Sequence, residues 1–206
     1  MHILLTDILT CPRCGPGFGL IVLADRIEDR RVLTGALGCA NCRNEYAVRE
    51  GVADLRIAPS EGGAGDMAAN EGDRAFRIAA LSGVADRQGT VLVAGAEPAL
   101  VGEVARLLPN AQMVGIGASE PGDTGGVSWV LAGGTLPFRD RSLLAAAILG
   151  SLDPALLTEL ARVVRPEGRL VLDGVGSWAA ASLAATEWTL LLEQEGVAVA
   201  SRTAGG

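Results

Sequence analysis

The chain has 206 residues, of which 49% are hydrophobic and 20% charged, so it is long enough for one medium domain and a small one. Its net charge of −7 is uneven. Residues 1–60 balance seven arginines against seven acidic residues, whereas residues 61–206 hold ten arginines and 17 acidic residues. Binding along a nucleic-acid backbone needs clustered cations, so the acidic second part argues against a nucleic-acid partner there.

The first residues do not read as a secretory signal, because Asp7 interrupts the apolar start and no basic residue precedes it. No apolar run approaches the roughly 20 residues that span a bilayer. All four cysteines have ligand-like spacing, which fits a reducing compartment. We therefore expect a cytoplasmic protein without a membrane segment.

Two CxxC motifs separated by 24 residues contain every cysteine of the chain. Paired motifs of this kind are typical of a tetrahedral zinc site with four thiolate ligands. Such a site has no open position for water or substrate, so the zinc would be structural. Two disulfides or four buried thiols are the alternatives, and the paired spacing favours zinc. The predicted zinc ligands are Cys11, Cys14, Cys39 and Cys42.

Residues 1–58 are expected to form a small zinc ribbon, with strands over 20–24 and 31–37 around a charged turn. The stretch 35–55 resembles the zinc-ribbon activator subunits of RNA and protein methyltransferases and their bacterial single-domain relatives. Ala47 and Ala53 stand where that family usually has proline. The resemblance implies a module that binds a methyltransferase fold, here within the same polypeptide.

Residues 59–69 are predicted to be a flexible glycine-rich linker, and residues 70–206 a second domain in which strands and helices alternate. Alternation with apolar strands predicts a parallel sheet covered on both faces. We expect strands over 90–94, 112–116, 127–131, 143–149, 169–173 and 197–201. We expect helices over 67–82 and 97–108, from 153 to the proline at 166, and over 177–195.

The second domain resembles class I methyltransferases that use S-adenosylmethionine, across about residues 70–175. The clearest stretch is 159–172, a helix, turn and strand, and the stretches 136–142 and 91–95 also fit. The resemblance implies an α/β fold with a Rossmann-like sheet. Only about 30 residues follow the strand at 169–173, so we expect a reduced sheet in place of the family's final hairpin. Such a sheet would leave an edge open to a partner.

The family binds its cofactor at a glycine-rich loop after the first strand, where the backbone must approach the ligand closely. Gly95 matches the first of these glycines and is the predicted cofactor-binding residue. The following glycine positions are occupied by Glu97 and Ala99, and Pro98 removes a backbone donor. Most of the loop that the resemblance requires is therefore missing.

Two acidic residues that the family places around its nucleoside are also missing. Gly117 stands where an acid at the end of the second strand binds the ribose, and Ala132 where an aspartate lies near adenine. We interpret the crevice as packing that no longer binds cofactor, and predict no catalytic residue. The alternative is that binding persists through backbone contacts, with Glu120 or Asp123 replacing the ribose acid.

The remaining candidates have ordinary interpretations. His2 is the single histidine and is expected at the surface. Asp173 ends a strand at the edge where sites gather, but an acid that caps a loop is equally consistent. Trp129, Trp178 and Trp188 are interpreted as core or interface anchors.

These observations predict a zinc-binding, methyltransferase-like protein without catalytic activity that acts as an interaction or activator subunit. Its partner would be another protein or a second copy of the chain. The alternative is an active S-adenosylmethionine-dependent methyltransferase with an atypical pocket, similar in organisation to rRNA guanine methyltransferases with a zinc finger. A third hypothesis is a regulatory module that binds another small ligand in the crevice.

Overall fold

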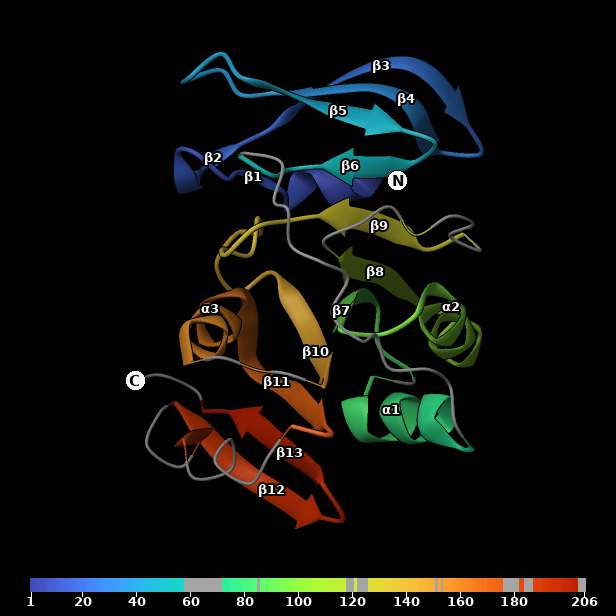
Figure 1. Ribbon diagram of the computed structural model, residues 1–206, viewed down its shortest axis with the longest axis vertical. Coiled ribbons are helices and arrows are strands. Elements are labelled where there is room, and N and C mark those ends of the chain that lie inside the picture. Colours follow the sequence, from blue (N-terminus) through green and yellow to red (C-terminus); the bar gives the residue numbers. More distant parts are fainter. Residues whose placement is uncertain are drawn as a thin grey trace.

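In the part of the chain that the structure describes, one mixed sheet of eleven strands runs along the long axis of the computed structural model (Figure 1). The strand order is β12-β13-β11-β10-β7-β8-β9-β6-β5-β4-β3, and β1 and β2 form a separate small sheet. The structure describes residues 1–57, 72–84, 86–117, 121, 126–150, 152, 154–175, 182–183 and 187–203.

The first 57 residues form a ribbon of short antiparallel strands, as the sequence predicts. The strand expected over 20–24 extends further, because the hairpin turns only at Asp29 and Arg30, both with positive φ. The elements are the 3-10 helix η1 (Ile3–Asp7), β1 (Thr10–Cys11), β2 (Gly15–Gly19), β3 (Ile21–Glu28), β4 (Arg31–Gly38), β5 (Glu45–Arg49) and β6 (Val52–Asp54).

Five parallel strands form the centre of the sheet, close to the predicted positions. They are β7 (Gly89–Ala94), β8 (Ala111–Gly117), β9 (Ser128–Leu131), β10 (Leu143–Leu149) and β11 (Val164–Asp173). The accompanying helices are α1 (Arg74–Ser82), α2 (Pro98–Leu107) and α3 (Pro154–Val163). The predicted start of the first helix, at residues 67–71, lies outside the described residues.

The helix expected over 177–195 is wrong from residue 188 onward, although residues 182–183 are helical. Residues 188–202 form an antiparallel hairpin of β12 (Trp188–Gln194) and β13 (Val197–Arg202) beside β11. Glu195 and Gly196 both have positive φ, as a two-residue type I′ turn requires. The antiparallel pair that we expected to be missing is therefore present. Leucine and glutamate favour a helix locally, but β13 aligns the segment as a strand.

Both faces of the sheet are covered, because successive side chains of each strand point to opposite sides. Val91 and Val93 of β7 share one core with α1 and α2. Leu92 of the same strand belongs to the other core, which includes α3 and η1. This two-sided burial confirms the expected α/β architecture.

Within the large sheet, the ribbon joins the central strands through the pairing of β6 with β9, which the sequence does not reveal. β6 pairs in parallel with β9, with Val52 opposite Trp129 and Asp54 opposite Leu131. Trp129 is buried against Gly115, where a Cβ atom would lie 2.1 Å from the indole. The ribbon thus continues the sheet, and the boundaries 1–58, 59–69 and 70–206 remain predictions.

None of the helices in the described part of the chain is long and apolar enough to cross a membrane.

Candidate metal centre and cofactor crevice

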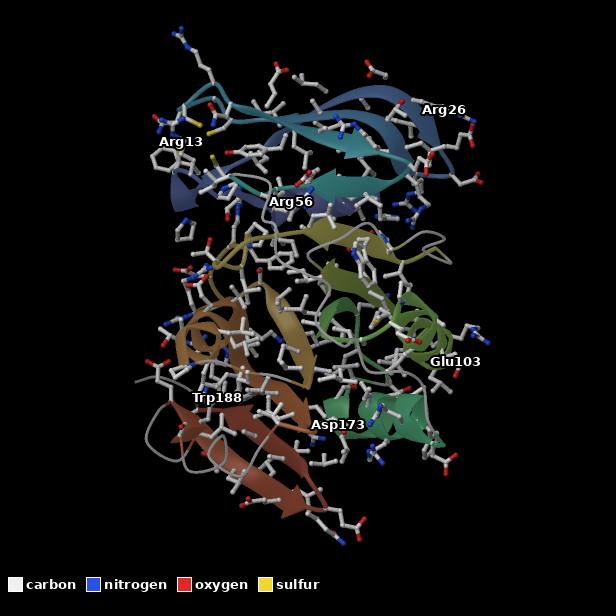
Figure 2. All side chains as sticks on the ribbon, viewed as in Figure 1. Arg13, Arg26, Arg56, Glu103, Asp173 and Trp188 are labelled. Carbon is white, nitrogen blue, oxygen red and sulfur yellow. The ribbon has the colours of Figure 1, made fainter. Side chains whose placement is uncertain are left out.

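The four cysteines lie in two tight turns at one end of the ribbon. Cys11 and Cys14 flank the turn between β1 and β2, and Cys39 and Cys42 flank the turn between β4 and β5. β4 runs parallel to β6, and β6 to β9, so the second turn lies at the edge of the sheet where the central strands end. Figure 2 shows the sulfur atoms grouped near Arg13, away from the β3–β4 turn.

The sulfur positions fit a tetrahedral metal ion. All four Sγ atoms lie within 4.8 Å of one another, with 3.7 Å between Cys11 and Cys42 and 3.9 Å between Cys14 and Cys39. Four thiolates about 2.3 Å from one zinc ion would lie about 3.8 Å apart. These separations are nearly twice the S–S bond length of about 2.05 Å, and all four cysteines are free. The cluster is therefore suited to a metal ion.

Hydrogen bonds favour the ionisation of one thiol, whereas the neighbouring sulfurs oppose the ionisation of a second thiol. Burial raises the pKa of Cys11, but the Tyr46 hydroxyl and neighbouring backbone groups outweigh it and lower the pKa to about 7. At Cys42, the Asn44 backbone lowers the pKa, yet burial and the other thiols raise it to about 11. Several thiolates so close together repel one another unless a cation lies between them.

Gly95 follows β7 at the carboxyl edge of the sheet and has a φ of +74°. A Cβ atom there would lie 2.1 Å from the carbonyl oxygen of Leu149, at the end of β10. Close packing of two strand ends therefore requires glycine at this position without any ligand. The role of Gly95 in cofactor binding stays a prediction.

The other strand ends of this edge carry few groups that could bind a nucleoside. β8 ends at Gly117, whose carbonyl accepts a hydrogen bond from the backbone N–H of Ala132 after β9. Glu97 caps α2 and Pro98 occupies its first position. Glu120 and Asp123, the proposed replacements for the ribose acid, lie outside the described residues.

Asp173, the acid at the end of β11, is 6% exposed and paired with two arginines of α1. Its Oδ2 lies 2.8 Å from Nη2 of Arg77 and 3.5 Å from Nε of Arg74. Figure 2 shows Asp173 beside α1. These ion pairs hold α1 against the sheet. The carboxylate therefore serves packing between a helix and a strand.

The sequence analysis missed a hydrogen-bond network that joins the stretches 136–142 and 159–172, both of which resemble methyltransferases. The guanidinium of Arg162 on α3 donates to the carbonyl oxygens of Leu136 and Phe138, at 2.8 and 2.6 Å. It also binds Glu159, which in turn accepts from the Leu136 N–H at 3.0 Å. Arg162 thus fixes the loop between β9 and β10 to α3.

The same loop pairs with the segment that leads into the first cysteine turn. The Thr10 N–H donates to the carbonyl of Pro137 at 2.9 Å, and the Arg139 N–H donates to the carbonyl of Ile8 at 2.8 Å. The cysteine cluster is thereby connected to the central part of the fold through Cys11, next in the chain to Thr10.

The remaining predicted positions are distributed over the fold. Trp129 and Trp188 are buried, as expected of core residues, and Trp178 lies outside the described residues. His2 is half-buried at the amino edge of the sheet, at the opposite end of the strands from their carboxyl ends. Its backbone N–H donates to the Ser128 hydroxyl.

The fold of this chain is similar to that of several solved methyltransferase structures at low sequence identity. Geranyl diphosphate C-methyltransferase from Streptomyces coelicolor, with Mg²⁺, geranyl diphosphate and S-adenosyl-L-homocysteine, has a TM-score of 0.51 and 14% identity, covering 63% of this chain and 78% of that one. The same enzyme with geranyl-S-thiolodiphosphate has a TM-score of 0.50 and 13% identity, and the match covers 63% of this chain and 75% of that one. The antibiotic-resistance methyltransferase Kmr has a TM-score of 0.45 and 16% identity, and the match covers 66% of this chain and 95% of that one.

This chain has the fold of a class I methyltransferase. At such low identity the likeness establishes the fold and no activity. No protein-family model and no curated protein matches the sequence.

Proposed function

We propose that Cys11, Cys14, Cys39 and Cys42 bind one zinc ion with a structural role. The support is the set of sulfur separations, which match a tetrahedron, and the all-cysteine ligand set, which leaves no position for a reacting water. When bound, the metal would supply a crosslink between the two cysteine turns. In small modules such binding is itself folding free energy.

We propose further that the methyltransferase-like part does not catalyse methyl transfer and acts as an interaction or activator subunit. The observation that carries this proposal is the absence of a carboxylate at Gly117 and Ala132, the ends of the two strands where the fold places its nucleoside acids. A nucleoside held there would leave buried hydroxyl and amine groups without partners, which costs about 1–3 kcal/mol for each group. Asp173 does not compensate, because two arginines already neutralise it.

The edge strands of the sheet support a role in protein binding. β3 is the last strand at the ribbon end, and three of its large aliphatic side chains are about half exposed: Ile21, Leu23 and Ile27. β12 at the opposite end exposes Leu190, Leu191 and Leu192. Unpaired strand edges with exposed apolar side chains are surfaces on which a partner strand or a second copy can bind.

Titration calorimetry with S-adenosylmethionine and S-adenosylhomocysteine tests the proposal, using protein that contains its metal. We expect no heat of binding, or a Kd weaker than about 1 mM for both compounds. Micromolar binding that releases heat would instead favour the catalytic alternative, an S-adenosylmethionine-dependent methyltransferase with an atypical pocket. Native mass spectrometry of the same sample measures zinc stoichiometry and oligomeric state, with one zinc per chain expected.

A further inference from the structure

A cavity of about 470 Å³ lies at the amino edge of the sheet, opposite the edge where the methyltransferase fold has its crevice. The first residues of three neighbouring strands line it: Gly89 of β7, Ala111 of β8 and Ser128 of β9. The N-terminal segment and the β3–β4 turn close it from the ribbon side. Its size is that of a small-molecule site, and no sequence motif pointed to it.

The charge of this cavity is opposite to that of the chain. His2, Arg30 and Arg31 line it, and no aspartate or glutamate occurs among its described lining residues. The whole chain has 24 acidic residues against 17 arginines. A cavity lined by two arginines and no acidic residue is therefore a local exception, and its field attracts an anion.

The titration of neighbouring groups agrees with an uncompensated positive field. Burial, followed by the charge of Arg31, lowers the pKa of the Met1 α-amino group to about 5. Burial and the charges of Arg30 and Arg31 also lower the pKa of His2. No carboxylate contributes to either shift.

The cavity wall also carries amide side chains. Gln112 of β8 lines it, and the Nε2 atom of this residue is buried without a hydrogen-bond partner. Its amide must turn toward the cavity before a ligand can accept from it. The side chains of Gln88 and Asn110 add two further amides to the wall.

Arg31 is held in place by the protein. Its Nη2 donates to the carbonyl of Val127 at 2.8 Å, and its Nη1 donates to the carbonyl of Gly126. These bonds fix the guanidinium without neutralising it, because carbonyl oxygens carry no net charge. Arg30 in the same turn is exposed and free to reach a ligand at the mouth.

We propose that this amino-edge cavity binds a small phosphate monoester with a hydroxyl-bearing body, in the size class of a pentose phosphate. The two arginines suit the phosphate, since guanidinium groups form charge-assisted bonds to its oxygens. The three amides suit hydroxyl groups, which both donate and accept. This inference is independent of the proposed loss of S-adenosylmethionine binding, because the two sites lie at opposite edges of the sheet.

Calorimetric titration with ribose 5-phosphate tests the proposal, with ribose and inorganic phosphate as the other two arms. We expect ribose 5-phosphate to bind, inorganic phosphate to bind more weakly and ribose not to bind. Arg30→Asn removes one charge while keeping a residue that tolerates positive φ, and Gln112→Met removes the unsatisfied amide. Each should weaken ribose 5-phosphate by about tenfold or more.

Arg141→Asn is the matched control, because Arg141 is also an exposed arginine with positive φ but does not line the cavity. It should leave the affinity unchanged. Thermal unfolding of every variant reports whether it folds. No binding of ribose 5-phosphate, equal binding of ribose, or unchanged affinity in folded Arg30→Asn and Gln112→Met would each overturn the proposal.

Discussion

The hydroxyl oxygen of Tyr46 lies 3.3 Å from the sulfur of Cys11, on the buried side of the cysteine cluster. Tyr46 is the single tyrosine of the chain and is 6% exposed on β5. The contact orients one ligand sulfur and favours its ionised form. Groups that hold metal ligands in this way contribute strongly to affinity.

Replacing Tyr46 with phenylalanine should therefore weaken zinc binding by about tenfold or more without removing the site. The aromatic ring and its packing stay, so only the hydrogen bond is lost. Competition with a chromophoric chelator measures the affinity. Asn41→Ala is the comparison, because Asn41 contacts the Cys14 sulfur from the exposed side. An unchanged affinity in Tyr46→Phe would show that the hydroxyl has no part in holding the metal.

Removing the metal should loosen more than the ribbon. The Thr10 and Arg139 amides join the first cysteine segment to the β9–β10 loop. Hydrogen exchange at these two amides should rise after chelation and in Cys39→Ser, since their bonds depend on the position of the first cysteine turn. Amides of β10 in the central sheet should exchange as before. Unchanged protection at Thr10 and Arg139 would show that the cluster does not position this segment.

Local patterns predicted those parts of the molecule whose cause is local. The CxxC spacing identified all four clustered cysteines, because the turns between them position sulfur through the chain itself. The apolar runs identified the five central strands, since both faces of each are buried. The fold of residues 70–175 could be predicted from the sequence for the same reason.

The parts that the sequence did not reveal depend on partners distant in the chain. Trp188–Gln194 has the composition of a helix, and only pairing with β13 and the Glu195-Gly196 turn makes it a strand. The junction of β6 with β9 joins segments whose apolar patterns do not specify each other. The amino-edge cavity likewise combines the N-terminus, the β3–β4 turn and three strand ends, and no motif records that combination.

Stability should fall in acid in a way that depends on Glu159. Hydrogen bonds from Arg162 hold the pKa of the Glu159 carboxyl below its ordinary value, although burial opposes them. The unfolded chain then binds more protons than the folded chain around and below pH about 4.3. This contribution is fully present above that pH and is lost as the pH falls through the folded pKa.

Glu159→Gln should therefore lower the free energy of unfolding at neutral pH and flatten its decline in acid. Urea unfolding at a series of pH values between neutrality and about 3 measures both effects. Glu103→Gln is the matched control, because Glu103 pairs with Arg106 at the same i,i+3 spacing on α2 but in a far more exposed setting. It should change little. Parallel acid curves for wild type and Glu159→Gln would contradict the prediction.

A substitution at Gly95 tests whether packing or cofactor binding requires glycine at this position of the carboxyl edge. Because a Cβ atom would meet the Leu149 carbonyl at 2.1 Å and φ is +74°, Gly95→Ala should lower stability by at least about 2 kcal/mol without any ligand. Gly133→Ala is the control, since its Cβ would meet nothing within 4 Å, and it should stay within about 0.5 kcal/mol. Urea unfolding of the ligand-free proteins measures both. Equal stability of Gly95→Ala and wild type would mean that packing does not require this glycine, and would leave close approach of a ligand as the physical reason for it.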